Sequence, residues 1–139
     1  MHLNTYLTFN GQCEAAFKFY EQCLGGKIVA MFTHAGTPAA GQVPPEWQDK
    51  IMHACLKAGD SMLMGSDAPP KYQQQPKGFS VNIAVEDPAE ADRIFQALAE
   101  NGTIKMPIAK TFWAERWGML IDQFGIPWMV NCEGAVKYQ

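Results

Sequence analysis

Hydrophobic and polar residues alternate over residues 4–9, which places Leu7 and Phe9 on one side of an extended chain. A period of two is typical of a strand with one buried face. The spacing then changes, because apolar residues recur every three or four positions from Ala16 to Leu24. That spacing predicts an amphipathic helix, and the glycine pair at residues 25–26 predicts its end.

The same order of elements returns 76 residues further along the chain. In the second copy, Asp87 and Pro88 have the residue types of a helix start, a carboxylate N-cap followed by proline. An apolar stripe from Ala91 to Leu98 follows, and residues 101–102, Asn-Gly, predict the helix end. The matched pairs of the two copies are Leu7 and Ile83, Phe9 and Val85, Phe19 and Phe95, and Gly26 and Gly102.

Three strand-like runs follow each helix. They cover residues 27–34, 50–57 and 61–66 in the first copy, and about 103–110, 117–122 and 127–132 in the second. We therefore predict an α+β fold of two βαβββ modules, whose mixed sheets pair to form a concave, barrel-like cavity. The expected organisation is a single domain, residues 1–139. It comprises module 1 (about 1–67), a linker (about 68–77) and module 2 (about 78–133), with a Gly- and Pro-rich loop at 35–49 whose role as a lid is open.

Composition narrows the class of protein. A chain of 139 residues that is 47% hydrophobic is long enough for one compact core. Its net charge is −3 and its basic residues are scattered, so we expect no nucleic-acid partner. No apolar run approaches the roughly 20 residues that span a bilayer, so no membrane contact is expected. The N-terminus lacks a basic region before an apolar stretch, which predicts a cytoplasmic protein. Its four cysteines, without a C-x-x-C pair, are then expected to be buried thiols.

Several short motifs stand in a fixed order along the chain. They are residues 6–11 (Tyr-Leu-Thr-Phe-Asn-Gly), 52–54 (Met-His-Ala), 66–68 (Ser-Asp-Ala), 112–113 (Phe-Trp), 117–119 (Trp-Gly-Met) and 122–125 (Asp-Gln-Phe-Gly). Together with the repeat, this set resembles the vicinal-oxygen-chelate superfamily of glyoxalase, bleomycin-resistance and extradiol dioxygenase proteins, and its PhnB-like branch more closely. The resemblance covers nearly the whole chain and implies a homodimer.

In metal-using members of that superfamily, the ligands are typically His and Glu on the first and last strands of each module. With Leu7 and Phe9 facing the helix, the first-strand positions fall here on Asn4 and Ser80. The last-strand positions, counted four residues on from the turn glycines Gly59 and Gly125, fall on Leu63 and Met129. Neutral oxygens and apolar side chains do not make a site for zinc, nickel or iron. We therefore expect no divalent metal and no other cofactor, and a cavity that either holds a small molecule or is filled core.

His53 and Asp67 are the candidate catalytic residues. An imidazole near a carboxylate could act as a general base close to neutral pH. The alternative is a structural histidine, with Asp67 capping the turn into the following prolines. The candidate ligand-pocket residues are Asn4, Tyr6, Leu63, Ser80, Asn82, Trp113, Arg116 and Met129.

The pocket candidates in the last third of the chain have competing interpretations. Trp113 beside Arg116 could form a ligand wall. Arg116 could equally form an ion pair with Asp122 or Glu115, and Trp128 is expected in the core. The methionines are expected to fill gaps in the core or to line an adaptable pocket.

Three functions follow as hypotheses. The first is a metal-independent, homodimeric small-molecule-binding protein. The second is a lyase or isomerase acting next to a carbonyl group, with His53 as base and Asp67 orienting it. The third is a non-catalytic dimeric interaction module. A nucleotide-dependent methyltransferase is not predicted, because the chain has no G-x-G-x-x-G loop between a strand and a helix.

Overall fold

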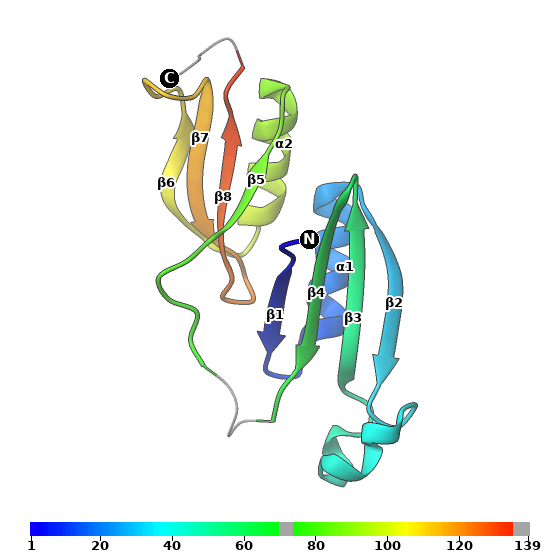
Figure 1. Cartoon of the computed structure of the whole chain (residues 1–139). Helices are drawn as coiled ribbons and strands as arrows, with labels where there is room; N and C mark the ends of the chain where they lie inside the picture. Colours follow the sequence, from blue (N-terminus) through cyan, green and yellow to red (C-terminus); the bar gives the residue numbers. More distant parts are fainter. Residues whose placement is uncertain (70–73, 135–139) are drawn as a thin grey trace. The chain divides into compact units, whose positions relative to one another are not determined.

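The computed structural model describes residues 1–69 and 74–134. The chain forms two compact units, Met1–Gln74 and Gln75–Gln139, and each contains a helix and a four-stranded mixed sheet (Figure 1). The predicted α+β class and the repeated βαβββ order are confirmed. Each sheet is open, and the pairing of the two sheets around one cavity stays a prediction. Residues 70–73 of the predicted linker lie outside the described residues.

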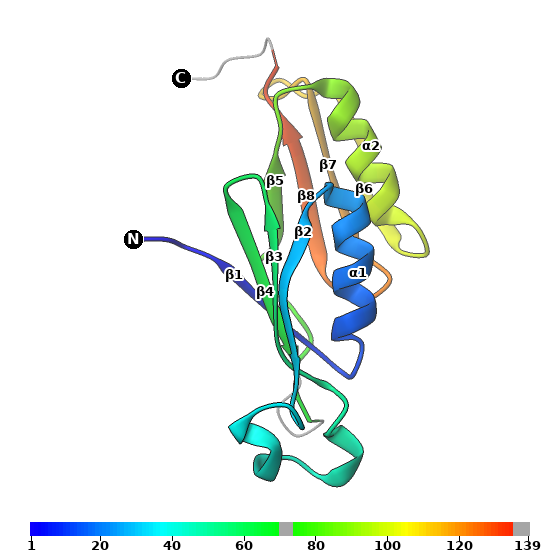
Figure 2. The ribbon, with the colours of Figure 1, turned by 90° about the vertical axis from the view of Figure 1, so that its right-hand side faces the viewer.

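The first unit contains β1 (Thr5–Phe9), α1 (Cys13–Leu24), β2 (Lys27–Thr33), β3 (Ile51–Ala58) and β4 (Ser61–Asp67). Two short 3-10 helices, η1 (Pro38–Gln42) and η2 (Pro45–Trp47), lie in the predicted loop between β2 and β3. The sheet order is β1-β4-β3-β2, with β1 parallel to β4 and the other neighbours antiparallel. Helix α1 covers one face of this sheet (Figure 2).

The second unit contains β5 (Val81–Ala84), α2 (Pro88–Ala99), β6 (Thr103–Ala109), β7 (Arg116–Ile121) and β8 (Pro127–Cys132). Its sheet order, β5-β8-β7-β6, repeats that of the first unit, with β5 parallel to β8. The predicted start of α2 is confirmed, because the carboxylate of Asp87 accepts a hydrogen bond from the backbone N–H of Ala89. The described residues contain no helix long and apolar enough to cross a membrane.

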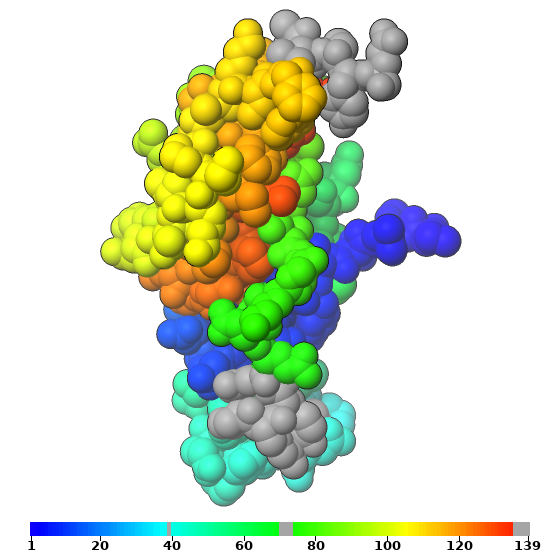
Figure 3. Space-filling view, turned by 90° about the vertical axis from the view of Figure 1, so that its left-hand side faces the viewer, coloured from blue at the N-terminus to red at the C-terminus, as the bar shows by residue number. Residues whose placement is uncertain are grey.

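Strand β6 is a free edge of its sheet, and most of its side chains are exposed (yellow in Figure 3). Free edges expose unpaired backbone groups that can pair with another chain. Lys105 and Pro107 stand in this strand, and a charge or a proline on an edge strand disfavours such pairing.

Each helix buries its apolar stripe against one face of its own sheet. In the first unit the stripe includes Phe17 and Tyr20, which pack with Phe9 of β1. A glycine on the sheet makes room for the helix in each unit. A Cβ atom at Gly65 would lie 2.8 Å from the Phe17 ring, and one at Gly118 would lie 2.7 Å from the Phe95 ring. Among the described residues, α1 and α2 each cover one face of their own sheet, and the opposite face is called the open face below.

Candidate functional site on the open sheet faces

The open face of the first sheet carries the alternate side chains of its strands. On β1, Tyr6 and Thr8 are exposed, whereas Leu7 and Phe9 are buried under α1, as the hydrophobic pattern predicted. Tyr6 is aligned with Met64 of β4. Neighbouring residues of paired strands lie on the same face of a sheet, so Met64 belongs to this open face.

The predicted position of Leu63 is wrong. Its side chain is only 8% exposed and pairs with the fully buried Leu56, which places it on the face covered by α1. The error comes from using the turn glycines Gly59 and Gly125 as equivalent landmarks. Two residues join β3 to β4, whereas five residues, 122–126, join β7 to β8. Counting four positions from each glycine therefore ends on opposite faces of the two sheets.

Strand register identifies the true equivalents. Tyr6 is aligned with Met64 in the first unit, and Asn82 is aligned with Met129 in the second. The last-strand positions of the two modules therefore both carry methionine. Asn82 is exposed on the open face beside Met129, and Ser80 is half-buried immediately before β5.

The donor set at the superfamily's ligand positions is thus Asn4, Met64, Ser80 and Met129. Thioethers are soft ligands and neutral amide or hydroxyl oxygens are weak ones, so these residues do not fit a zinc, nickel, iron or manganese ion. Within residues 1–69 and 74–134, no group of three His, Cys, Asp or Glu side chains is arranged to hold a metal ion.

His53 contacts Tyr6 rather than Asp67. The Tyr6 hydroxyl lies 3.3 Å from His53 Nδ1, and the two rings stack with their centroids 5.8 Å apart. This contact crosses β4, which lies between β1 and β3 in the sheet. The sequence offered no direct signal for it, because Tyr6 and His53 are 47 residues apart and their strands are not neighbours.

Asp67 has a structural position beneath the sheet. It is 3% exposed, and its two carboxylate oxygens accept hydrogen bonds from the backbone N–H groups of Cys13 and Ile51, each at 2.9 Å. Burial and, next, the nearby Asp67 carboxylate raise the pKa of the Cys13 thiol well above its ordinary value. Asp67 therefore joins the start of α1 to the start of β3, and it lies on the opposite face from His53.

The Arg116 side chain lies on the face of the second sheet that α2 covers. Its Nε donates a 2.8 Å hydrogen bond to Asp92 of α2, in an ion pair that is partly buried. The ion-pair interpretation of Arg116 is confirmed, but the partner is Asp92 rather than Asp122 or Glu115. Asp122 instead accepts hydrogen bonds from the backbone N–H groups of Phe124 and Ile126 in its own turn.

The tryptophans of the second unit have two different environments. Trp128 is 1% exposed, which confirms its predicted place in the core, and its indole N–H donates a 2.8 Å hydrogen bond to Asp122. Trp113 instead packs edge-on against Phe112 and Trp117. Trp117 is aligned with Asn131 of β8, so it lies on the open face.

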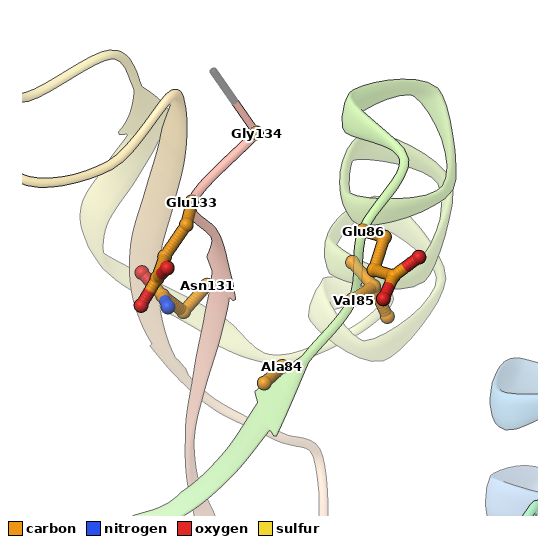
Figure 4. Close-up of a pocket in the computed structure, with 6 residues that line it drawn as sticks. All are labelled: Ala84, Val85, Glu86, Asn131, Glu133 and Gly134. Atoms are coloured by element: carbon orange, nitrogen blue, oxygen red, sulfur yellow. The ribbon is translucent and has the colours of Figure 1, made fainter. Parts of the chain in front are cut away.

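A hollow lies where the carboxyl ends of β5 and β8 meet the following loops (Figure 4). Its volume is about 600 Å³, and its lining residues are Ala84, Val85, Glu86, Asn131, Glu133 and Gly134. The buried Oδ1 atom of Asn131 has no hydrogen-bond partner within the described part of the chain. None of these residues was identified from the sequence, because a lone Asn near a strand end carries no distinctive pattern.

Comparison with known proteins agrees with this architecture. Protein YjdN from Escherichia coli (strain K12) is 34% identical to this protein, in an alignment that covers 100% of this chain and 98% of YjdN. The crystal structure of protein PA1353 from Pseudomonas aeruginosa has 47% identity and a TM-score of 0.88, covering 96% of this chain and 98% of that one.

A PhnB protein from Bacillus cereus shares the fold, with a TM-score of 0.76 at 24% identity over 95% of this chain and 99% of its own. The family model for the glyoxalase/bleomycin resistance protein/dioxygenase superfamily matches residues 2–130. With two βαβββ units of equal topology and relatives that span its full length, the chain belongs to the glyoxalase/bleomycin resistance protein/dioxygenase superfamily.

Proposed function

We propose that this protein binds a small molecule without a metal ion. The observation that carries the proposal is the strand register, which puts methionine at both last-strand positions where metal-using relatives place a ligand. Thioethers at these two positions remove the charged donors that hold a divalent ion in such sites. We also propose, as the family resemblance implies, that the protein acts as a cytoplasmic homodimer.

The open face of the first sheet offers the contacts that such a ligand needs. Tyr6 supplies a hydroxyl, His53 an imidazole, and Met64 a flexible apolar surface, all within neighbouring positions of the sheet. Small-molecule sites commonly combine apolar side chains with a few polar groups that orient the ligand. Methionine adapts to irregular shapes, which suits a ligand-binding surface.

A thermal-shift screen tests the proposal. A compound that binds only the native state raises the melting temperature by mass action. We expect at least one small metabolite to do so, equally in protein treated with a chelator and in untreated protein. Met64→Leu should weaken that effect, whereas Met52→Leu, a similar change elsewhere in the first sheet, is the matched control. A stoichiometric divalent ion in protein purified without chelators would contradict the proposal.

A second candidate function is catalysis of proton transfer next to a carbonyl group. The observation that favours it is the contact between the Tyr6 hydroxyl and His53 Nδ1 at 3.3 Å. In this reaction the Nδ1–H group of His53 donates to the Tyr6 oxygen, which holds the ring, and the lone pair of Nε2 takes the proton from carbon. The imidazolium then returns that proton to another atom of the substrate. Tyr6 thus takes the orienting role that the sequence suggested for Asp67.

Single variants separate this reaction from simple binding. Once a substrate is identified, His53→Gln should abolish turnover while leaving substrate binding, and Tyr6→Phe should lower kcat more than it changes KM. Full turnover by His53→Ala would rule out this mechanism. Asp60→Asn, a change at an exposed turn residue of the same unit, is the control and should leave both kcat and KM unchanged.

A further inference from the structure

We propose that the hollow at the ends of β5 and β8 binds the cationic, N–H-bearing end of a small molecule, such as an ammonium or guanidinium group. This inference rests on the proposed small-molecule binding and names the chemical class of ligand that the second unit would bind. It concerns two residues of that unit alone, Asn131 and Glu133.

The hollow exists because a small side chain stands beside a larger polar one. Ala84 of β5 is aligned with Asn131 of β8, and the last ladder contact is the bond from the Val85 N–H to the Asn131 carbonyl oxygen at 3.0 Å. Beyond this point the segments that follow β5 and β8 separate, one towards Glu86 and the other towards Gly134 (Figure 4). Ala84 contributes only a methyl group to the wall of the hollow beside Asn131.

Asn131 has an unused hydrogen-bond acceptor at this place. Its Oδ1 is buried and has no partner among residues 1–69 and 74–134. Buried side-chain acceptors nearly always have a donor, so this amide is arranged for a donor group that residues 1–69 and 74–134 do not supply. Strand register shows that Ser66 holds the equivalent position in the first unit, so the fold does not itself require an amide there.

Glu133 adds a negative charge beside that acceptor. Figure 4 shows the Glu133 and Asn131 side chains next to each other and directed to the same side, whereas Glu86 points away from them. Within the described residues Glu133 forms no ion pair, and the two arginines of this unit, Arg93 and Arg116, are paired with residues of α2.

The chemistry of these groups selects the ligand. A carboxylate and an amide oxygen only accept, so the ligand has to bring N–H donors, and the carboxylate favours a positive charge. Within the described residues no three His, Cys, Asp or Glu side chains are grouped to hold a metal ion, so the hollow favours an organic cation over calcium or magnesium.

The test is an NMR titration of the full-length protein with methylguanidinium chloride, following backbone and side-chain amide signals. We expect saturable shifts of the Asn131 side-chain amide and of the Val85 and Gly134 backbone amides. Tetramethylammonium chloride, which has the same charge but no N–H group, should bind at least about tenfold more weakly, as loss of charge-assisted hydrogen bonds predicts.

Variants locate the binding. Asn131→Ser, which copies the first unit, and Glu133→Gln should each weaken methylguanidinium binding about tenfold. Glu86→Gln makes the same charge change in the same hollow but on a side chain that points away, so it should bind within about twofold of wild type. Equal binding of tetramethylammonium, equal weakening by Glu86→Gln and Glu133→Gln, or shifts that do not saturate would each overturn the inference. If Asn131→Ser does not fold, Glu133→Gln alone decides.

The same variants distinguish failure of this inference from failure of the proposed function. If a compound from the thermal-shift screen stabilises Asn131→Ser and Glu133→Gln as much as wild type, small-molecule binding stands and the hollow is not its cation site. If stabilisation by that compound is lost in both variants, and methylguanidinium competes with it, both proposals are supported.

Discussion

The Tyr6 hydroxyl lies 3.3 Å from Nδ1 of His53 on the open face of the first sheet. The base role proposed for His53 requires Nδ1 to donate to the Tyr6 oxygen, because Nε2 then keeps its lone pair for the substrate proton. We therefore expect long-range ¹H–¹⁵N spectra of neutral His53 to show mainly the Nδ1–H tautomer. Tyr6→Phe should shift His53 towards a mixture of tautomers.

His34 provides an internal control in the same spectra. Its Nδ1 lies 3.1 Å from the backbone carbonyl oxygen of Lys50, which can only accept, so neutral His34 should carry its proton on Nδ1. Tyr6→Phe should leave the His34 signals unchanged. The same His53 tautomer ratio in wild type and Tyr6→Phe would show that the hydroxyl does not orient this ring.

Asp67→Asn should lower the free energy of unfolding, because Asp67 has a structural role whether or not it takes part in catalysis. One of the two backbone N–H groups that Asp67 binds would face an amide NH₂ group and lose its acceptor. A buried donor without a partner costs about 1–3 kcal/mol, which a urea unfolding curve measures. Asp60→Asn, on an exposed turn residue, should change the free energy of unfolding by less than about 0.5 kcal/mol. Equal stability of Asp67→Asn and wild type would contradict the structural role.

Cys13 should make the protein less stable at alkaline pH. Burial first, and then the Asp67 and Glu14 carboxylates, raise the pKa of its thiol in the folded state. Above about pH 8.5 the unfolded thiol releases its proton while the folded thiol keeps it, so ionisation stabilises the unfolded state. The free energy of unfolding should therefore fall as pH rises, by up to about 1.4 kcal/mol per pH unit from this group.

Unfolding curves at several pH values between about 8 and 10 measure this loss. Lysines and tyrosines also titrate in this range, so the informative quantity is the difference between wild type and Cys13→Ala. The variant should be less stable near neutral pH because it leaves a small cavity, yet its stability should fall less steeply with pH. Parallel pH profiles of the two proteins would contradict the prediction.

Gly65→Ala and Gly118→Ala should each destabilise the protein by about 1–3 kcal/mol. The added methyl group would lie 2.8 Å from the Phe17 ring in the first case and 2.7 Å from the Phe95 ring in the second, closer than packed atoms allow. Gly41→Ala is the control, because nothing lies within 4 Å of a Cβ atom there. Thermal unfolding of the three variants under one set of conditions measures the effect. Wild-type stability of Gly65→Ala would mean that α1 can move away from the sheet at little cost.

The two errors in the predicted site share a physical origin. Leu63 was assigned to the open face by counting from a turn glycine, but the turns of the two modules differ in length. His53 and Asp67 were paired because their strands are neighbours, yet they project from opposite faces. In a β-sheet a shift of one residue reverses the face on which a side chain lies, so small differences in turn length change a predicted site completely.

The order of apolar and polar residues also does not predict contacts between elements that are far apart in the sequence. Arg116 was expected to pair near itself in the sequence, but its partner Asp92 lies 24 residues away on α2. The Tyr6–His53 contact joins strands that are separated by β4, and the Asn131 oxygen that has no partner within the described residues lies beside a hollow. Each of these depends on how elements far apart in the sequence pack or align.

The sequence by itself determined the repeated βαβββ order, the faces of the helices, the start of α2 and the absence of charged metal donors at Asn4, Ser80 and Met129. These features are local, since the periods of strands and helices come from backbone geometry and show directly in the order of apolar residues. Only the tertiary structure decided that Met64 is the counterpart of Met129, that Tyr6 is the partner of His53, and that Asn131 borders a hollow. These depend on register and packing between segments far apart in the chain, which no local period records.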